Sequence, residues 1–319
     1  MCGIVGIVDR DLSRPVGAEE LQQMVRMLHH RGPDEEGSIT LNGVGLGMRR
    51  LAIVDLATGQ QPILNETGDI KIVANGEIYN CQALRDELEG YGHTFRSRHS
   101  DIEVLVHAYE QWGEDFLPRL RGMFALAIWD GRTKTLIAAR DRAGEKPLYW
   151  TLTAQGLLLA SEVKALLVRP EVSRELDPIA LDQFLTYEYV LAPRTMIKGV
   201  HKIPPAHFLK YRDGEVTVHR YWDAADVPLR EWDDREAAEA LRAALRKAVV
   251  SQLMADVPLG AFLSGGIDSS TLVAFMSESA AQPVNSFSIG FSDGTYNELP
   301  YVIDVENFLE CCAAVCCAV

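Results

Sequence analysis

The chain has 319 residues, of which 47% are hydrophobic and 24% charged, so it has a globular composition and enough length for two domains. A formal net charge of -14 and the absence of a Lys/Arg cluster argue against a nucleic-acid-binding protein, because phosphates are bound by clustered cations. The apolar runs are shorter than the roughly 18–20 residues of a membrane span. Asp9 and Arg10 interrupt the first of these runs too early for a signal peptide, so we expect a cytoplasmic protein without membrane partners.

The first residues place a cysteine directly after Met1 and before a short apolar run. If Met1 is removed, Cys2 holds both a thiol and a free α-amine, whose reference pKa values are ~8.5 and ~7.7–8.0. The amine could then accept the thiol proton and return it to a leaving group, as in N-terminal nucleophile hydrolases. Judged by position alone, Cys2 could equally be a small residue that opens a buried strand.

Strands and helices alternate from the start of the chain. Residues 4–8 and 39–48 are predicted as strands, and apolar spacing over 19–28 predicts an amphipathic helix. The polar segment 29–34 indicates a turn. Segment 49–55 places arginine at the start of an apolar strand, where a guanidinium could bind a carboxylate.

The pair Asn75-Gly76 follows the apolar run 72–74. Asn-Gly at a strand end is typical of a tight turn. The same pair could form an oxyanion hole, because the Asn75 amide and the Gly76 N–H could both point at a developing negative oxygen. A helix is predicted over 83–89, and Ser100-Asp101 precedes another helix, where Asp101 could be only a cap residue.

Together and in this order, these segments resemble the glutaminase domain of class II glutamine amidotransferases. The resemblance extends from residue 1 to about 210 and implies an α+β fold, the αββα sandwich of N-terminal nucleophile hydrolases. The matching segments are Met1-Cys2-Gly3-Ile4, His30-Arg31-Gly32-Pro33-Asp34, Arg50-Leu51-Ala52-Ile53-Val54-Asp55, Asn75-Gly76-Glu77-Ile78-Tyr79-Asn80, Ser100-Asp101, 121–125 and 139–149.

The resemblance also implies a role for each matching residue. Cys2 would attack the side-chain amide of glutamine, with Asn75 and Gly76 stabilising the oxyanion. The other residues implied in glutamine binding are Arg50 for the α-carboxylate, Glu77 and Asp101 for the α-ammonium, and Leu51, Ala52, Ile53 and Val54 as the lining of the site. Glutamate and ammonia would be the products.

The glutaminase domain is predicted to cover residues 1–220. Near its end, Asp177 is predicted to cap a helix, and strands 208–211 and 216–220 form a hairpin that turns at Asp213-Gly214. Residues 221–234 lack clear periodicity and are predicted as a linker. A long helix follows over 235–254.

The next segment combines a buried strand, a glycine loop and a helix. Such a loop can bind phosphate through its backbone amides and the helix N-terminus. It lacks the ending of a Walker loop, and its Ser-Gly-Gly-x-Asp-Ser form resembles the pyrophosphate loop of ATP pyrophosphatases. This implies the start of an α/β parallel-sheet domain of the adenine nucleotide alpha hydrolase-like type. The implied ATP-binding residues are Leu263, Ser264, Gly265, Gly266, Asp268, Ser269 and Ile289, with Asp268 holding Mg²⁺.

A glutaminase followed by a pyrophosphate-loop domain resembles the arrangement of glutamine-hydrolysing asparagine synthetases. The resemblance implies that ATP, as its Mg²⁺ complex, adenylates aspartate and that ammonia from glutamine displaces AMP to give asparagine. The substrates would be glutamine, aspartate and ATP, with no prosthetic group.

The resemblance ends near residue 305. We expect residues 235–305 to be the start of an incomplete synthetase domain and 306–319 to be an anomalous tail, because four of the six cysteines, Cys311, Cys312, Cys316 and Cys317, lie there. Truncation or a shifted reading frame would explain this tail. A two-stranded remnant would expose an unpaired edge, which predicts instability or a homodimer through that edge. We also expect the chain to hydrolyse glutamine without completing asparagine.

Two alternatives remain open. One is a related pyrophosphate-loop ligase similar to β-lactam synthetases, although that family typically lacks the nucleophilic cysteine. The other is a non-catalytic fragment that acts only by association with other subunits.

Overall fold

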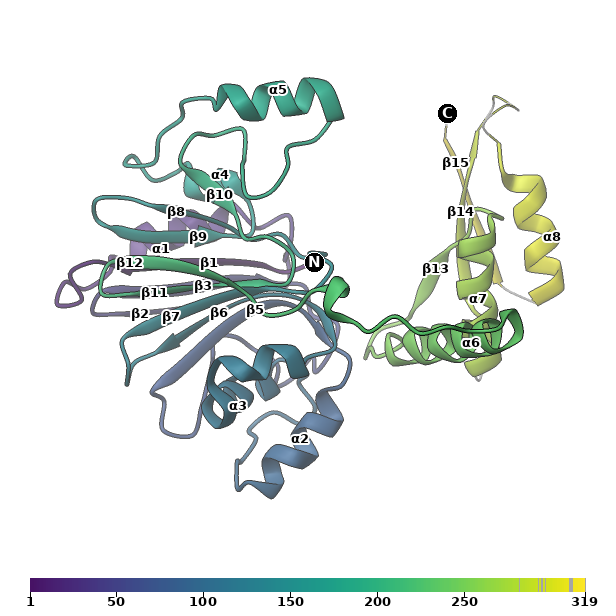
Figure 1. The fold of residues 1–319 in the computed structure, drawn as a ribbon, viewed down its shortest axis with the longest axis horizontal. Helices are drawn as coiled ribbons and strands as arrows, with labels where there is room; N and C mark the ends of the chain where they lie inside the picture. The colour runs from purple at the N-terminus through teal and green to yellow at the C-terminus, as the bar shows by residue number, and fades with distance from the viewer. Residues whose placement is uncertain (281, 292, 294, 296, 310–311, 319) are drawn as a thin grey trace. The chain divides into compact units, whose positions relative to one another are not determined.

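A computed structural model describes residues 1–319 except 281, 292, 294, 296, 310, 311 and 319. The chain forms two compact units, Met1–Pro228 and Leu229–Val319 (Figure 1). The division falls within the segment 221–234 that the sequence predicts as a linker.

The first unit is built on two six-stranded antiparallel sheets. In spatial order, the first sheet contains β10 (Val200–Lys202), β8 (Tyr149–Leu152), β9 (Gly156–Ala160), β1 (Gly3–Asp9), β3 (Val44–Arg50) and β2 (Glu35–Leu41). The second contains β12 (Glu215–Arg220), β11 (His207–Arg212), β7 (Thr135–Arg140), β6 (Gly122–Asp130), β5 (Ile70–Ile78) and β4 (Ile63–Leu64).

Helices cover the outer faces of both sheets, as Figure 1 shows. One side holds α1 (Ala18–Arg26) and α4 (Val163–Leu166), and the other holds α2 (Cys81–Gly90), α3 (Glu103–Trp112) and the 3-10 helix η1 (Gly113–Arg119). The remaining helices are α5 (Pro178–Tyr187) and the 3-10 helix η2 (Ala224–Asp226). The unit is therefore the predicted αββα sandwich.

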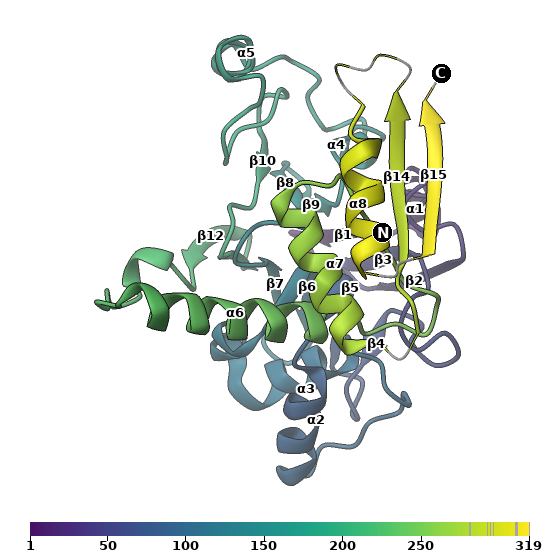
Figure 2. The ribbon, with the colours of Figure 1, turned by 90° about the vertical axis from the view of Figure 1, so that its right-hand side faces the viewer.

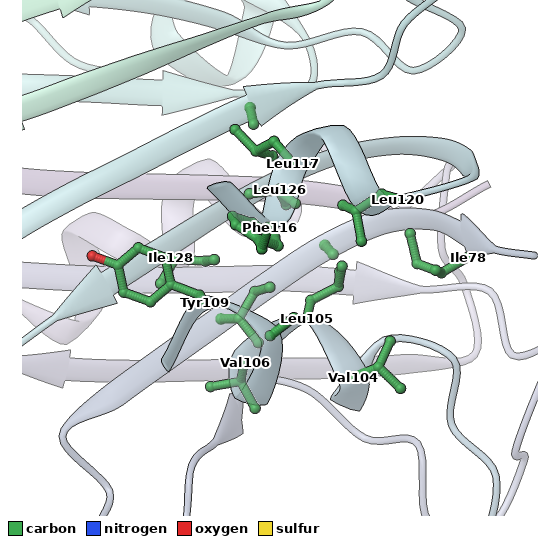
Figure 3. Close-up of a cluster of buried hydrophobic side chains, with 14 of the residues drawn as sticks. Ile78, Val104, Leu105, Val106, Tyr109, Phe116, Leu117, Leu120, Leu126 and Ile128 are labelled. Atoms are coloured by element: carbon green, nitrogen blue, oxygen red, sulfur yellow. The ribbon is translucent and has the colours of Figure 1, made fainter. Parts of the chain in front are cut away.

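Three buried clusters correspond to the three interfaces between these layers. The central cluster joins the inner faces of the two sheets, with Ile4 and Val73 among its members. A second packs α1 and α4 on the first sheet. The third packs α2, α3 and η1 on the second sheet, and Figure 3 shows Leu105, Tyr109 and Phe116 within it.

Strand alternation explains why β1 is apolar along its length. Successive side chains of a strand point to opposite faces. Ile4 and Val8 accordingly enter the central cluster, whereas Val5 and Ile7 enter the cluster under α1. A strand buried on both faces needs a continuous apolar run.

Three local predictions differ from the structure. Residues 39–48 are not one strand but the turn region of the β2–β3 hairpin, where Gly43 adopts a φ of 70°. The strand expected from Arg49 ends at Arg50, and residues 51–55 form a loop. Asn75-Gly76 makes no turn, because β5 continues through both residues to Ile78.

Other predictions are confirmed at the level of single elements. The Asp177 side chain caps α5 by accepting the backbone N–H groups of Ile179 and Ala180. The β11–β12 hairpin turns at Asp213 and Gly214, whose φ values of 52° and 80° are the positive values of a tight hairpin turn.

The second unit contains a parallel sheet flanked by helices. Its elements are α6 (Asp234–Ser251), β13 (Gly260–Phe262), α7 (Ile267–Ser279), β14 (Asn285–Phe291), α8 (Leu299–Leu309) and β15 (Cys312–Ala318). Both strand pairs are parallel, and Figure 2 shows β14 and β15 side by side in the same direction. A buried cluster that includes Leu263, Val273 and Val302 lies between sheet and helices.

The expectation of a two-stranded sheet is wrong. Residues 312–318 of the predicted tail form β15, which pairs with β14 along seven residues. One edge of the two strands considered in the homodimer prediction is therefore paired with β15, and the homodimer itself stays a prediction. Residues 310, 311 and 319 of the tail lie outside the described residues. Among the described residues, no helix is both long and apolar enough to cross a membrane.

Candidate active site

Strand alternation brings Cys2 and Asn75 to the same space between the two sheets. Ile4 and Val73 belong to the central cluster between the sheets. Cys2 lies two residues before Ile4, and Asn75 lies two residues after Val73. Residues two apart on a strand share a face. Both side chains line one cavity of about 140 Å³.

The Cys2 thiol is held against the backbone of Leu51. The N–H of Leu51 lies 3.4 Å from the sulfur, and the thiol lies 3.7 Å from the carbonyl oxygen of Leu51. Burial raises the pKa of the Cys2 thiol, while the Leu51 backbone bond and the N-terminal ammonium act in the opposite direction. The thiol therefore needs a neighbouring base before it can act as a nucleophile.

The segment 30–34 fixes the backbone around Cys2. The guanidinium of Arg31 donates from Nε to the Cys2 carbonyl at 2.8 Å and from Nη1 to Glu162 at 3.0 Å. Asp34 accepts the backbone N–H of Ala52 at 2.9 Å. The sequence predicted only a turn here, whereas the structure shows that this turn positions both the nucleophile and the loop beside it.

Asn75 presents a buried amide group with no partner for its nitrogen among the residues that the structure describes. The side chain is 1% exposed, and its Nδ2 has no hydrogen-bond acceptor. Buried donors are nearly always paired, so an unpaired one is a costly feature that needs an explanation. A group that binds only when a ligand or transition state is present would explain it.

Gly76 contributes a backbone N–H on the same edge of β5. The N–H of Ala74 donates to Gln61 at 2.7 Å, and the N–H of Ile78 donates to Asp101 at 2.8 Å. Gly76 lies between them, and alternate residues of a strand direct their N–H groups to the same edge. A side chain cannot be added, because a Cβ at Gly76 would lie 2.0 Å from the carbonyl oxygen of Met123.

Arg50 places a buried cation at another wall of the cavity. Its guanidinium donates to Glu35 at 2.7 Å and to the carbonyl oxygens of Val54 and Asp55 at 2.9 and 2.8 Å. Arginine has five N–H donors in a planar fork, so this side chain is held in place and keeps further donors for a carboxylate. Gly59 leaves room for it, since a Cβ there would lie 2.5 Å from Nη2 of Arg50.

Asp55 organises the loop that supplies these carbonyl groups. Burial opposes its ionisation, yet hydrogen bonds from Thr58 and from the backbone of His99 outweigh burial and lower the pKa of Asp55 to about 2. The residue adopts a φ of 50°. This left-handed backbone conformation bends the chain beside Arg50. From the sequence, Asp55 was recognised only as the last residue of a motif.

Two carboxyl groups, Glu77 and Asp101, line the cavity together. Burial raises the pKa of Asp101 to about 7, with a contribution from the charge of Glu77 and an opposing one from the Ile78 N–H. Burial also raises the pKa of Glu77. Asp101 is not a helix cap, since the residue at the N-cap of α3 is Ile102. Two partly desolvated carboxyl groups would be stabilised as carboxylates by a bound cation.

The cavity gathers most of the predicted glutaminase residues. Cys2, Arg50, Leu51, Ile53, Val54, Asn75, Gly76, Glu77 and Asp101 line it. Ala52 is absent from the lining, and its N–H is directed to Asp34 instead.

Several lining residues were given no role in glutamine binding from the sequence: Met1, Gly59, Gln61, Ala74, Ser100, Ile102, Met123 and Lys146. Lys146 lies in segment 139–149, so only the family resemblance could have indicated it. Gln61 had no signal, because its role depends on the tertiary pairing of its side-chain amide with the backbone of Ala74.

The predicted phosphate loop lies between β13 and α7 in the second unit. The Ser269 hydroxyl lies 3.0 Å from the Ser264 hydroxyl and 3.2 Å from the Ser264 backbone nitrogen, which donates to it. Gly265 has a φ of 77°, and a Cβ there would lie 2.6 Å from that of Tyr301. The loop is therefore a tight turn that glycine makes possible.

The remaining predicted ATP-binding residues differ in exposure. Asp268 is exposed in the first turn of α7. Ile289 is 52% exposed. The Leu263 side chain is only 2% exposed and belongs to the core of the unit, so a nucleotide would meet its backbone and not its side chain.

Comparison with known proteins agrees with this geometry. Residues 1–222 match the family model of the glutamine amidotransferase domain. The chain belongs to this glutamine amidotransferase family. Residues 240–311 of this amidotransferase match a second family model, asparagine synthase.

Relatives of this glutamine amidotransferase include glutamine-hydrolysing asparagine synthetase 1 of Bacillus subtilis (strain 168), which is 39% identical over 94% of this chain and 47% of its own length. Asparagine synthetase 3 of the same organism is 38% identical over 92% of this chain and 48% of its own length. The chain thus spans about half the length of these curated relatives.

A solved structure described as the allosteric regulatory enzyme of purine biosynthesis matches with a TM-score of 0.52 at 16% identity, covering 99% of this chain and 80% of that chain. At this identity the likeness concerns the fold alone.

Proposed function

We propose that this chain hydrolyses the side-chain amide of glutamine to glutamate and ammonia, with Cys2 as the nucleophile. The observation that supports this most directly is the buried, unpaired Nδ2 of Asn75 in the same cavity as the Cys2 thiol. A donor without a partner beside a nucleophile has the properties of an oxyanion hole.

The proposed reaction begins after removal of Met1. The α-amine of Cys2 accepts the thiol proton, and the thiolate sulfur forms a bond to the amide carbon. The carbonyl oxygen becomes an oxyanion that accepts hydrogen bonds from the side-chain N–H of Asn75 and the backbone N–H of Gly76. The proton on the amine then moves to the amide nitrogen. The carbon–nitrogen bond breaks, ammonia departs, and the acyl group remains bound to the Cys2 sulfur as a thioester.

Water completes the cycle. The α-amine accepts a proton from the attacking water, whose oxygen forms a bond to the thioester carbon. Collapse of the second tetrahedral intermediate expels the sulfur, which regains the proton, and glutamate leaves. Burial lowers the pKa of the Met1 amine in this structure; a similar burial of the Cys2 amine after Met1 removal would favour its neutral form, which accepts protons.

Recognition of the substrate follows from the charges of the cavity. We propose that Arg50 binds the α-carboxylate, and that Glu77 and Asp101 bind the α-ammonium. One held cation and two carboxyl groups match one anion and one cation on the ligand. Leu51, Ile53 and Val54 would line the aliphatic part of the site, while Ala52 would contribute by keeping the loop in place.

The experiment that tests this proposal measures glutamate release by the purified full chain. Cys2→Ala should abolish release, whereas Cys81→Ala should leave it nearly unchanged, because Cys81 does not line the cavity. Mass spectrometry should find the chain without Met1, and a glutamine-mimicking electrophile should label Cys2. Equal activity of the wild type and Cys2→Ala would rule the proposal out.

We extend the proposal to a role in glutamine-dependent asparagine synthesis in the cytoplasm, whose further substrates are aspartate and ATP: this chain would supply the ammonia-releasing step without completing asparagine by itself. The asparagine synthase match over 240–311 and the names of the Bacillus relatives support it. Ser264, Gly265, Gly266 and Ser269 would contact phosphates through backbone N–H and hydroxyl groups, and Asp268 is accessible for Mg²⁺ on the nucleotide.

A binding measurement tests the nucleotide part separately. The full chain should bind Mg²⁺–ATP in equilibrium dialysis, and Asp268→Asn should weaken binding when Mg²⁺ is present more than when it is absent. Asn297→Ala serves as a control outside the loop. Asparagine formation from glutamine, aspartate and ATP is measured in parallel, so that failure to bind ATP and failure to transfer ammonia can be distinguished.

A further inference from the structure

Outside the proposed active site, four polar side chains of the first unit converge. Glu66 lies in the turn between β4 and β5, His93 follows α2, and His107 and Glu110 lie one turn apart on α3. One nitrogen or oxygen atom of each lies within 4.8 Å of those of the other three. Two imidazoles and two carboxylates thus meet at the junction of three segments.

His107 is the buried member, and its ring has an unusual environment. The side chain is 1% exposed and packs against Phe95, with 4.5 Å between ring centroids. Its Nδ1 lies 3.2 Å from Glu66 and its Nε2 lies 3.7 Å from Glu103, yet within the described part of the chain neither nitrogen makes a hydrogen bond of acceptable geometry.

A neutral imidazole has one N–H group and one lone pair. With a carboxylate near each nitrogen, one lone pair of the neutral His107 ring must face a negatively charged oxygen. A cation at that position removes the repulsion and gives the unpaired nitrogen a partner. The buried ring, which lies between carboxylates without a hydrogen bond of acceptable geometry, therefore indicates a bound cation.

We propose that Glu66, His93, His107 and Glu110 bind a divalent transition-metal ion of the Zn²⁺ class. Imidazole nitrogen and carboxylate oxygen are the donors that Zn²⁺ takes in tetrahedral sites. Bonds of about 2.0–2.2 Å place tetrahedral ligands about 3.3–3.6 Å apart, so the cluster needs only a modest contraction. The two carboxylates balance the ionic charge, whereas Mg²⁺ and Ca²⁺ prefer oxygen ligands throughout.

Outer contacts hold the proposed ligands in position. Glu103, near Nε2 of His107, is itself anchored by the backbone N–H groups of Arg96 and Ser97 at 2.7 and 2.8 Å. A shortening of the 3.7 Å separation between Nε2 of His107 and Glu103 would give the carboxylate–histidine–metal arrangement.

The other ligands have such partners as well. Glu66 accepts the N–H of Thr94 at 2.9 Å, Glu110 accepts an N–H of Asn65 at 2.9 Å, and His93 lies 3.3 Å from the side-chain oxygen of Gln111. Each carboxylate keeps lone pairs for a metal.

The ion would connect the β4–β5 turn, the α2–α3 connection and α3. The α2–α3 connection also includes His99, whose N–H donates to Asp55, and Asp101. The site would therefore stabilise the segment from which the proposed ammonium-binding carboxylate comes. This inference does not depend on glutamine hydrolysis.

The test uses the full chain with five of its six cysteines replaced. Cys2 is changed to Ala, and Cys311, Cys312, Cys316 and Cys317 to Ser, because thiolates bind Zn²⁺. Equilibrium dialysis of the metal-free protein should give one bound Zn²⁺. His93→Gln and Glu110→Gln should each weaken binding about 100-fold or more, beyond the roughly 10–100-fold effect of losing an outer partner.

His219→Gln is the matched control, because His219 is exposed on β12 and outside the cluster; its affinity for Zn²⁺ should be unchanged. Zn²⁺ should raise the melting temperature of the control and not that of His93→Gln. Co²⁺ should give the visible absorption of a tetrahedral site only when His93 is present. Circular dichroism confirms that each variant is folded.

Two results would overturn the proposal. One is that the parent chain with the five cysteine substitutions binds no Zn²⁺, which would leave the four side chains without a metal-binding role. The other is equal Zn²⁺ binding by His93→Gln, Glu110→Gln and the control, which would place the ion elsewhere.

Discussion

At the scale of single residues, the proposed site stores unfavourable interactions that a substrate would relieve. The Nδ2 of Asn75 is buried without a partner, and Asp101 and Glu77 are two carboxyl groups in one partly dry cavity. Each feature costs stability in the free protein, because buried polar groups lose their hydration. Each becomes favourable when an oxyanion or an ammonium group is bound.

Asn75→Ala should therefore separate activity from stability. The change removes an oxyanion-hole donor, so we expect kcat for glutamine hydrolysis to fall about 10²–10³-fold. Thermal stability should not fall much, since the deleted Nδ2 has no partner to lose. Steady-state kinetics and thermal unfolding give the two readouts.

Asn65→Ala is the control for that prediction. Asn65 is also buried, but it donates to Glu110 and accepts the N–H of Ile70. Its loss should lower the melting temperature with little direct effect on kcat. The reverse pattern, an unstable Asn75→Ala with normal kcat, would assign Asn75 a structural role.

Asp101 predicts a pH dependence of substrate affinity. Burial raises its pKa to about 7, and an α-ammonium is bound by the carboxylate form. The KM for glutamine should fall as pH rises through about 7, and Asp101→Asn should raise KM and flatten the profile. A KM profile that is the same in both proteins would contradict this role.

The same residue predicts how stability changes with pH. The unfolded pKa is about 3.9, so between about pH 4 and 7 the folded state holds more protons than the unfolded state. The free energy of unfolding should fall as pH rises across this window, by at most about 1.4 kcal/mol per pH unit from this group. The free energy of unfolding, measured with urea at several pH values, should change less steeply with pH in Asp101→Asn than in the wild type.

At the scale of elements, the site depends on the close approach of β5 and β6. Gly76 pairs with Phe124, and a Cβ at Gly76 would lie 2.0 Å from the Met123 carbonyl oxygen. The glycine thus permits both the strand register and the open N–H edge. The β-sheet provides a rigid support for the nucleophile and the oxyanion hole, which approach from the inner faces of different sheets.

Gly76→Ala should destabilise the first unit by about 1–3 kcal/mol, because an added methyl group forces backbone shifts in a packed region. Gly90→Ala is its control: the residue ends α2, and a Cβ there has no neighbour within 4 Å. That variant should be unchanged or up to about 1 kcal/mol more stable, since alanine favours helix. Chemical unfolding measures both, and equal effects would contradict the packing argument.

At the scale of the whole molecule, the two units have separate cores. The clusters of the αββα sandwich contain residues up to Tyr221, and the cluster of the parallel sheet begins at Ala261. The predicted linker 221–234, in which the two units meet along the chain, includes Arg230, which is exposed. Separate cores linked by an exposed segment favour independent folding of the glutaminase unit.

Limited trypsin digestion should therefore cleave first after Arg230. The N-terminal product should retain glutamine hydrolysis, because all residues of the proposed glutaminase site precede the cut. Mass spectrometry identifies the fragment, and glutamate release measures its activity. Initial cleavage within the sandwich, or a folded fragment without activity, would contradict this division of function.

The sequence alone determined the αββα fold, through the family motifs, and most of the residues that meet at the cavity. It also indicated the capped helix at Asp177 and the β11–β12 hairpin, because caps and tight turns depend on neighbouring residues. The β2–β3 turn was missed, since apolar residues on both sides of Gly43 resemble one continuous strand. The third parallel strand was missed because its stability depends on pairing with β14.

Only the tertiary structure decided what the polar residues do. Asn75-Gly76 has the composition of a turn, and the pairing of β5 with β6 keeps it extended and leaves its donors facing the cavity. Asp101 resembles a helix cap, and long-range contact with Ile78 makes it part of the cavity wall. Local patterns predict local hydrogen bonds, whereas burial and the pairing of distant strands determine which donors and charges remain for a ligand.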